Sequence, residues 1–294
     1  MTEPRPLTID ELKRHPLPPA RQEDKYGHGQ LLLVAGSRQT PGSAVITATA
    51  AQRAGCGKVT IATSADVAPH IALAAAEARV LWLAEGRRGG LARSALRELD
   101  EHVELADCVV AGPGIAKGPQ CGALARRLLA DRPRALVFDA AILLELEPHA
   151  ELCREAGPIL LPHDKEMAAL IGCDEDEAER EPLRCGRECA SHYGALVLVK
   201  GPISRIVSPD DRTWEYAGCE PGLGVAGSGD VLAGIVGGLA ARGADPLTAL
   251  LWAIWLHGEA GSALAKKIGP IGYLAREISA EIPALLDRAQ PSLE

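Results

Sequence analysis

Aromatic side chains are scarce in this sequence. They make up 3% of its 294 residues, and Phe138 is the single phenylalanine, although hydrophobic residues together account for 47%. The core must therefore be built mainly from Leu, Val, Ile and Ala. Such a composition favours a parallel sheet covered by helices over an aromatic-rich β-sandwich.

An excess of positive charge is also missing. The formal net charge is -8 and the sequence pI is about 5.6, so the chain lacks the electrostatic footprint of a nucleic-acid-binding protein. We therefore expect a small-molecule partner and no nucleic acid.

Long apolar segments and paired cysteines are missing too. No run approaches the roughly 18 apolar residues of a membrane helix, and the start, MTEPRPLTIDELKRHPLPP, carries charges and prolines where a signal peptide needs an apolar stretch. The eight cysteines include no CxxC pair, which favours free thiols in a reducing compartment over a metal site. We expect a cytoplasmic protein with no membrane partner.

The sequence does contain a regular alternation of short apolar runs and helix-length segments. This pattern indicates a parallel sheet with helices on both faces. The runs are residues 30–36, 58–63, 78–83, 107–114, 134–140, 158–162 and 195–201.

The alternation ends after residue 201. RIVSP and TWEYAG flank the turn DDR and predict a hairpin, and three helices should follow at 229–242, 246–267 and 272–286. The apolar segment LLWAIWLHG, residues 250–258, is expected in the core. The acidic segment DEDEAERE, residues 174–181, predicts a solvated helix face. We expect one domain over residues 1–294, with an N-terminal arm of about 28 residues wrapped over its body.

The stretch GVAGSGDVLAGIVGGLAARG, residues 224–243, places Asp230 between glycines and an apolar helix. The first N–H groups of a helix lack intrahelical acceptors, and the helix dipole favours anions there. An isolated Asp in this position can simply complement the dipole. A helix start that serves stability alone, however, needs a Ser, Thr or Asp cap rather than several glycines. A carboxylate beside an anion-binding turn is what phosphoryl transfer requires.

With GSGD opening a late helix after a hairpin, the chain resembles the ribokinase-like fold, a three-layer α/β/α arrangement with a mostly parallel central sheet. Within that fold it resembles the ADP/ATP-dependent NAD(P)H-hydrate dehydratases, formerly described as carbohydrate kinases. The resemblance extends from KYGHGQLLLVAGS through AGPGI, VFDAA, ILLPHDKEM and LVLVKGPIS to LHGEAG and GPIGYLAREISAEIPALL. It implies a repair lyase that dehydrates hydrated NADH or NADPH, with ADP or ATP as co-substrate and Mg²⁺.

The resemblance also implies roles for individual residues. Asp230 would be the catalytic base and would contact the substrate, and backbone amides would form an anion hole. The anion-hole residues are Gly227, Ser228 and Gly229; the nucleotide-binding residues are Lys200, Gly201, Pro202, Ile203, Ser204 and Gly229; and the other substrate-binding residues are Ser43, Gly114 and His163. Glu166 would hold the metal through water. Ser43 also suits the N-cap of a helix, and Lys200 ends a predicted strand, where open α/β sheets bind ligands.

Several positions depart from the family pattern, mostly on the substrate side: Ser43, Ala116, Ala141, Asp164 and Lys165. Two other functions therefore stay open, a ribokinase-like kinase for a vitamin precursor or sugar, and a non-catalytic nucleotide-binding protein. A Rossmann dehydrogenase is disfavoured, because VAGSRQTPGS lacks GxGxxG spacing.

Three further expectations concern the whole protein. We expect a homo-oligomer. We expect no companion epimerase domain, because the family motifs begin about thirty residues into the chain. The sequence leaves ADP against ATP, and NADHX against NADPHX, undecided.

Overall fold

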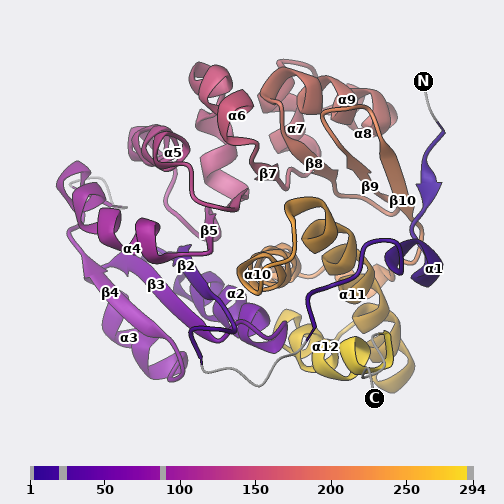
Figure 1. Cartoon of the computed structure of the whole chain (residues 1–294), viewed down its shortest axis with the longest axis horizontal. Helices are drawn as coiled ribbons and strands as arrows, with labels where there is room; N and C mark the ends of the chain where they lie inside the picture. Colours follow the sequence, from indigo (N-terminus) through magenta and orange to yellow (C-terminus); the bar gives the residue numbers. More distant parts are fainter. Residues whose placement is uncertain (1–2, 20–24, 87–90, 290–294) are drawn as a thin grey trace.

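The predicted apolar runs form neighbouring strands of one sheet. The computed structural model describes residues 3–19, 25–86 and 91–289. Seven of its strands run parallel in the order β8-β7-β6-β5-β2-β3-β4 (Figure 1). They are β2 (Gln30–Val34), β3 (Lys58–Ser64), β4 (Arg79–Leu83), β5 (Cys108–Ala111), β6 (Leu136–Phe138), β7 (Ile159–Leu160) and β8 (Leu196–Val199). The predicted parallel sheet is confirmed.

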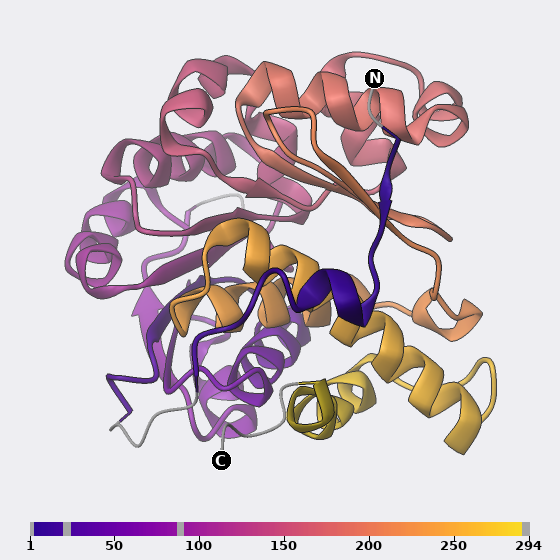
Figure 2. The same cartoon turned by 45° about the vertical axis from the view of Figure 1, so that its right-hand side comes forward.

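The expected hairpin extends this sheet. β9 (Ser204–Val207) runs antiparallel to both β8 and β10 (Thr213–Tyr216). The N-terminal segment adds β1 (Arg5–Pro6), which pairs with β10 in parallel, and continues into the short helix α1 (Ile9–Leu12). Figure 2 shows this segment crossing the body of the molecule. Of the predicted arm, residues 1–2 and 20–24 lie outside the described residues.

Two layers of helices cover the sheet, and successive residues of β2 show why. Leu31 and Leu33 belong to one buried cluster, whereas Leu32 and Val34 belong to another, because side chains alternate between the two faces of a strand. The first cluster contains side chains of α2 (Pro41–Arg53), α3 (Ala68–Ala74), α10 (Ser228–Ala241), α11 (Pro246–Lys267) and α12 (Ala275–Ala289).

The second cluster lies under a different set of helical segments. They are η1 (Arg93–Leu99), α4 (Asp100–Leu105), α5 (Pro119–Asp131), η2 (Ala140–Glu145), α6 (Ala150–Ala156), α7 (Asp164–Ile171), α8 (Glu175–Arg180) and α9 (Pro182–Tyr193). Two short 3-10 turns complete the element order, η3 (Glu147–His149) and η4 (Pro221–Leu223). The result is the expected three-layer α/β/α arrangement.

The three predicted late helices are α10, α11 and α12. Helix α11 buries the apolar segment 250–258 as expected: Leu250 and Leu251 are fully buried, and Trp252 is 2% exposed. Among the residues that the structure describes, no helix is both long and apolar enough to cross a membrane.

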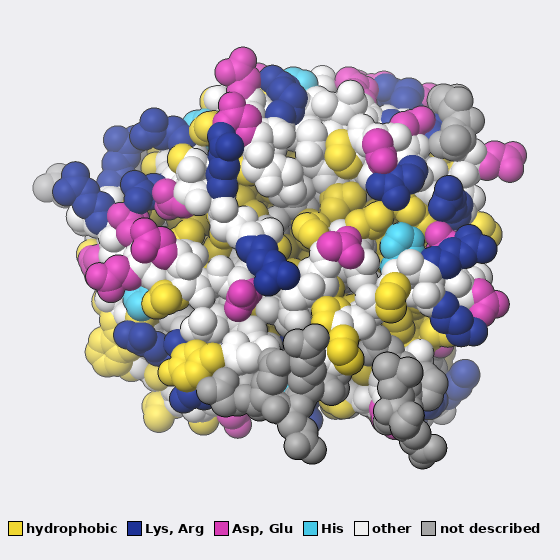
Figure 3. All heavy atoms as spheres, in the orientation of Figure 1, with side chains coloured by type: hydrophobic (Ala, Val, Ile, Leu, Met, Phe, Trp, Pro, Cys, Tyr) yellow, Lys and Arg dark blue, Asp and Glu magenta, His cyan; other side chains and the backbone are white. Residues whose placement is uncertain are grey.

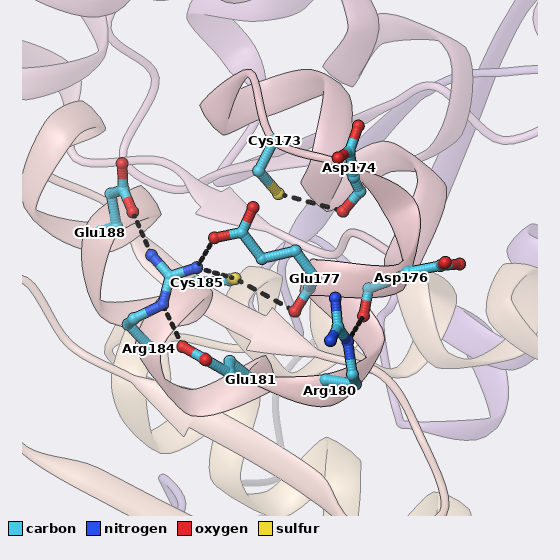
Figure 4. A network of polar contacts seen from close by, with 9 residues as sticks. All are labelled: Cys173, Asp174, Asp176, Glu177, Arg180, Glu181, Arg184, Cys185 and Glu188. Carbon is cyan, nitrogen blue, oxygen red and sulfur yellow. Dashed lines mark hydrogen bonds and ion pairs between the residues drawn. The ribbon is translucent and has the colours of Figure 1, made fainter.

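The acidic segment 174–181 lies at the surface, as predicted. Arg184 of α9 forms ion pairs with Glu177, Glu181 and Glu188 (Figure 4). Exposed pairs of this kind contribute little to stability. On the face shown in Figure 3, basic and acidic side chains are interspersed.

Helix α10 packs unusually close to α2, and glycines make this possible. A Cβ atom at Gly234 would lie 2.3 Å from the Thr47 carbonyl oxygen, and one at Gly238 would lie 2.6 Å from that of Ala51. No other residue fits at such distances without moving the helices apart. The close contact brings the N-termini of α2 and α10 together at one edge of the sheet.

Candidate active site

The predicted site residues gather at the carboxyl edge of the parallel strands, where open α/β sheets bind ligands. Ser43 follows β2, Gly114 follows β5, His163 and Glu166 follow β7, and Lys200 follows β8. A cavity of about 870 Å³ opens at this edge. Its lining includes Thr40, Gly114, Ala116, Ala141, His163 and Glu166.

Helix α10 brings Asp230 to the same edge. Gly227 is its N-cap and has a φ of 90°, a left-handed conformation that favours glycine. The Ser228 amide donates to the Val225 carbonyl oxygen at 3.1 Å. The amides of Gly229 and Asp230 belong to the same first turn, whose N–H groups have no acceptor within the helix. The Ser228 amide is therefore already engaged, and the Ser228 hydroxyl oxygen lies 3.0 Å from Nε2 of His257.

The Asp230 carboxylate is partly buried and lies beside the N-terminus of α2. Burial raises its pKa, and the nearby negative charge of Asp139 acts in the same direction. A hydrogen bond with the Ser43 side chain and the positive charge of Lys200 both lower the pKa. A partly buried carboxylate whose pKa is raised above its usual value is suited to general base catalysis.

Ser43 and Gly114 are in direct contact. Gly114 has a φ of 64°, and a Cβ atom there would lie 2.6 Å from the Ser43 Cβ. Helix α2 begins at Pro41 with Thr40 as its N-cap, so Ser43 is the third helical residue and its interpretation as an N-cap is wrong. The Thr40 hydroxyl instead donates to the Gly114 carbonyl oxygen at 2.9 Å. Ser43 therefore connects the cavity lining to Asp230.

Lys200 forms a partly buried ion pair with Asp139, a residue that the site prediction did not include. Its Nζ lies 2.7 Å from Oδ1 of Asp139, which follows β6 and is 3% exposed. A Cβ atom at Gly229 would lie 3.5 Å from this Nζ, so Lys200 also adjoins the first turn of α10. The signal for Asp139 is the segment VFDAA, where a carboxylate directly follows an apolar strand.

His163 and Glu166 form the N-terminal cap of α7. The His163 Nδ1 accepts from the Lys165 amide at 3.2 Å, and the His163 amide donates to Oε2 of Glu166 at 3.1 Å. Burial raises the pKa of Glu166, and the charge of Asp139 adds to this. The two departures from the family pattern, Asp164 and Lys165, occupy the first turn of a regular helix.

The segment KGPIS forms the turn between β8 and β9. Gly201 and Pro202 are exposed, and Ile203 is partly buried. Ser204 is buried, with its hydroxyl oxygen 3.5 Å from the Cys219 sulfur. The turn lies beside Lys200 at the carboxyl edge, and its nucleotide-binding role stays a prediction.

A sequence model of the family described as NAD(P)H-hydrate dehydratase matches residues 31–284. The chain belongs to this family. Two curated proteins, both described as an ADP-dependent (S)-NAD(P)H-hydrate dehydratase, resemble it along nearly their whole length. The Xanthomonas campestris pv. campestris protein is 43% identical over 98% of this chain and 99% of its own. The Neisseria meningitidis serogroup B protein is 31% identical over 93% of this chain and 91% of its own.

Other NAD(P)H-hydrate dehydratase relatives are longer. The bifunctional NAD(P)H-hydrate repair enzyme of Moorella thermoacetica is 33% identical over 91% of this chain, which covers 51% of that enzyme. The chain thus spans about half the length of such relatives.

Solved structures show the same fold. The ADP/ATP-dependent NAD(P)H-hydrate dehydratase of Bacillus subtilis, co-crystallised with ATP and Mg²⁺, superposes with a TM-score of 0.84 at 23% identity, covering 99% of this chain and all of the other. A ribokinase-like superfamily protein of Enterococcus faecalis gives a TM-score of 0.81 at 22% identity, and the match covers 97% of this chain and 96% of the other. The expected ribokinase-like fold is confirmed.

Proposed function

We propose that this chain dehydrates hydrated NADH or NADPH at the expense of ADP or ATP, as a lyase of nicotinamide cofactor repair. ADP is the favoured co-substrate, because the two near-full-length relatives are described as ADP-dependent. One structural observation carries the proposal: the partly buried Asp230 carboxylate, in the first turn of α10, lies near Lys200 and the Ser43 side chain that leads to the cavity.

In this proposal Asp230 accepts the proton of the substrate ring hydroxyl. The hydroxyl oxygen then attacks the terminal phosphorus of the nucleotide, and the bond from that phosphorus to the bridging oxygen breaks, leaving AMP from ADP or ADP from ATP. Hydroxide is a poor leaving group, whereas phosphate is a good one. The lone pair of the ring nitrogen expels it, and loss of a proton from the neighbouring ring carbon restores the reduced nicotinamide.

The positive groups at the edge would stabilise the phosphoryl group in transit. The first-turn amide of Gly229 and the left-handed turn at Gly227 suit an anion, because the positive end of the helix dipole lies there. Lys200 adjoins the same turn, and Gly201, Pro202, Ile203 and Ser204 follow it as the proposed nucleotide contact. His163 and Gly114 line the cavity that would hold the nicotinamide part.

The donor set at this edge fits Mg²⁺ bound together with nucleotide phosphates. Mg²⁺ in such sites takes one or two protein carboxylates and keeps several waters. Among the described residues there is no cluster of three or more His, Cys, Asp and Glu, but Glu166 lies buried near Asp139. Glu166 would hold the ion through water, and the bound Mg²⁺ would neutralise phosphate charge.

Acid-hydrated NADH, incubated with the protein, Mg²⁺ and either ADP or ATP, tests the proposal. The near-ultraviolet absorbance of reduced nicotinamide should return and free phosphate should appear. Asp230→Asn should abolish both, by at least about 10²-fold, because the hydroxyl loses its base. Accumulation of a phosphorylated product without recovered absorbance would favour a kinase. Nucleotide binding without turnover in the wild type would favour a non-catalytic binding protein.

The proposal includes a homo-oligomer in the cytoplasm. Trp82 of the edge strand β4 is 60% exposed and Leu73 of the neighbouring helix α3 is 85% exposed, and these apolar side chains support association. All eight cysteines are free thiols, which is typical of a reducing compartment. Sedimentation of the wild type and of Trp82→Glu measures the association; a wild-type monomer would contradict it.

A further inference from the structure

His257 of α11 is partly buried and contacts the first turn of α10. Its Nε2 lies 3.0 Å from the Ser228 hydroxyl oxygen and 3.2 Å from the Ser228 carbonyl oxygen. Burial lowers the pKa of His257 to about 4, and the positive charge of Lys200 acts in the same direction. The positive end of the α10 dipole also disfavours a second cation here. The imidazole is therefore neutral at pH 7 and carries a single N–H.

The two contacts decide which ring nitrogen carries that hydrogen. A carbonyl oxygen only accepts hydrogen bonds, whereas a hydroxyl group can donate or accept. Because Nε2 faces the carbonyl oxygen, its hydrogen must be present for that contact to be favourable. The same N–H then also faces the Ser228 hydroxyl oxygen, which accepts from it. The hydroxyl hydrogen of Ser228 is consequently left to be donated elsewhere.

Resting on the proposed function, we propose that His257 is a positioning residue for phosphoryl transfer: its Nε2–H holds Ser228 so that the serine hydroxyl donates to the transferring phosphoryl group. The Ser228 amide cannot donate to the phosphoryl group, because it already donates to the Val225 carbonyl oxygen. The Ser228 hydroxyl thus joins the Gly229 amide and Lys200 around the anion.

Steady-state kinetics of paired variants test the coupling of the two residues. Ser228→Ala and His257→Leu should each lower kcat by roughly 100- to 1,000-fold, the range found when one donor to a developing charge is removed, with the KM for the nucleotide changed by less than about threefold. The double variant should be no slower than the slower single variant, because His257 acts through Ser228. His257→Gln, whose side-chain amide can replace the Nε2–H, should recover most of the activity.

Two controls separate positioning from folding. Thermal unfolding should show that each variant is folded at the assay temperature, and His70→Gln on the exposed surface of α3 should leave kcat unchanged. Wild-type kcat in Ser228→Ala, or losses that multiply in the double variant, would overturn the inference.

The hydrogen position itself can be observed without turnover. Nitrogen-15 NMR of the histidine-labelled wild type, free of nucleotide, should show His257 as the neutral Nε2–H form across neutral pH. The neutral Nδ1–H form or a titrating His257 would overturn the inference. An inactive wild type would instead mean that the proposed function is wrong, so the two failures remain distinguishable.

Discussion

At the scale of single residues, the proposed chemistry depends on what surrounds the Asp230 carboxylate. Burial and the charge of Asp139 raise its pKa, whereas the Ser43 hydrogen bond and Lys200 lower it. A general base works best when its pKa lies near the working pH. Because some neighbouring residues raise this pKa and others lower it, substituting them should shift the pH dependence of the reaction in either direction.

Ser43→Ala should move the acidic limb of the profile of kcat/KM against pH to higher pH. The variant removes a hydrogen bond that favours the charged carboxylate, so the pKa of Asp230 rises further and more alkaline solution is needed to deprotonate it. Thr49→Ala, on the same helix, is the matched control, because the Thr49 hydroxyl bonds only to the Val45 carbonyl oxygen among the contacts of the described residues. Identical limbs in wild type and Ser43→Ala would contradict the assignment of Asp230.

Asp139→Asn should move the same limb to lower pH. Removing this negative charge lowers the pKa of Asp230, and it also leaves the Lys200 ammonium without its 2.7 Å ion pair. Ser43→Ala and Asp139→Asn should therefore shift the acidic limb in opposite directions, which a general change in the site would not produce. A shift of both limbs in the same direction would mean that Asp230 is not the titrating group.

At the scale of elements, the site depends on the close contact between α2 and α10, which bring Ser43 and Asp230 together. Gly234→Ala should lower the free energy of unfolding by about 1–3 kcal/mol, since the added Cβ would collide with the Thr47 carbonyl oxygen at 2.3 Å. It should also lower kcat, because the helices must separate. Urea unfolding and kinetics measure the two effects.

Gly42→Ala is the control for the unfolding measurement. Gly42 lies in the first turn of α2, and a Cβ atom there meets nothing within 4 Å. The variant should be as stable as the wild type or slightly more so. Equal stability of Gly234→Ala and Gly42→Ala would show that the helices can separate without cost.

At the scale of the whole molecule, buried polar contacts fasten the N-terminal segment to the body. The Trp214 indole donates to the Glu11 carboxylate at 2.9 Å, and the Trp252 indole donates to the His15 carbonyl oxygen at 2.7 Å. Glu11→Ala should lower the free energy of unfolding by about 1–3 kcal/mol, because it leaves the Trp214 N–H buried without its acceptor. Urea unfolding checks this.

Asp10→Ala provides the comparison on the same short helix. Asp10 forms only an exposed ion pair with Lys13 among the contacts of the described residues, and exposed pairs stabilise little. Its unfolding midpoint should match that of the wild type. If Glu11→Ala behaved in the same way, the N-terminal segment would not be part of the cooperative fold.

Local patterns in the sequence determined much of this protein. The apolar runs predicted the parallel strands, DDR predicted the hairpin, and the glycines before Asp230 predicted the start of α10. Strand burial, turn chemistry and helix termini depend on neighbouring residues, so they can be predicted without the fold. The N-cap of α2 was placed at Ser43, three residues beyond the observed Thr40, because Pro41 and Gly42 are typical turn residues although proline suits the first helical position.

Only the tertiary structure decided which of these local features meet. Lys200 pairs with Asp139, 61 residues away, and His257 contacts Ser228, 29 residues away. Ser43 meets Asp230 because Gly234 and Gly238 let two helices approach. Such contacts join separate elements, and their burial and charge follow from how those elements pack. The sequence by itself therefore determined the elements and predicted Asp230 as the base, whereas packing decided the surroundings of this carboxylate and which side chains contact its neighbours.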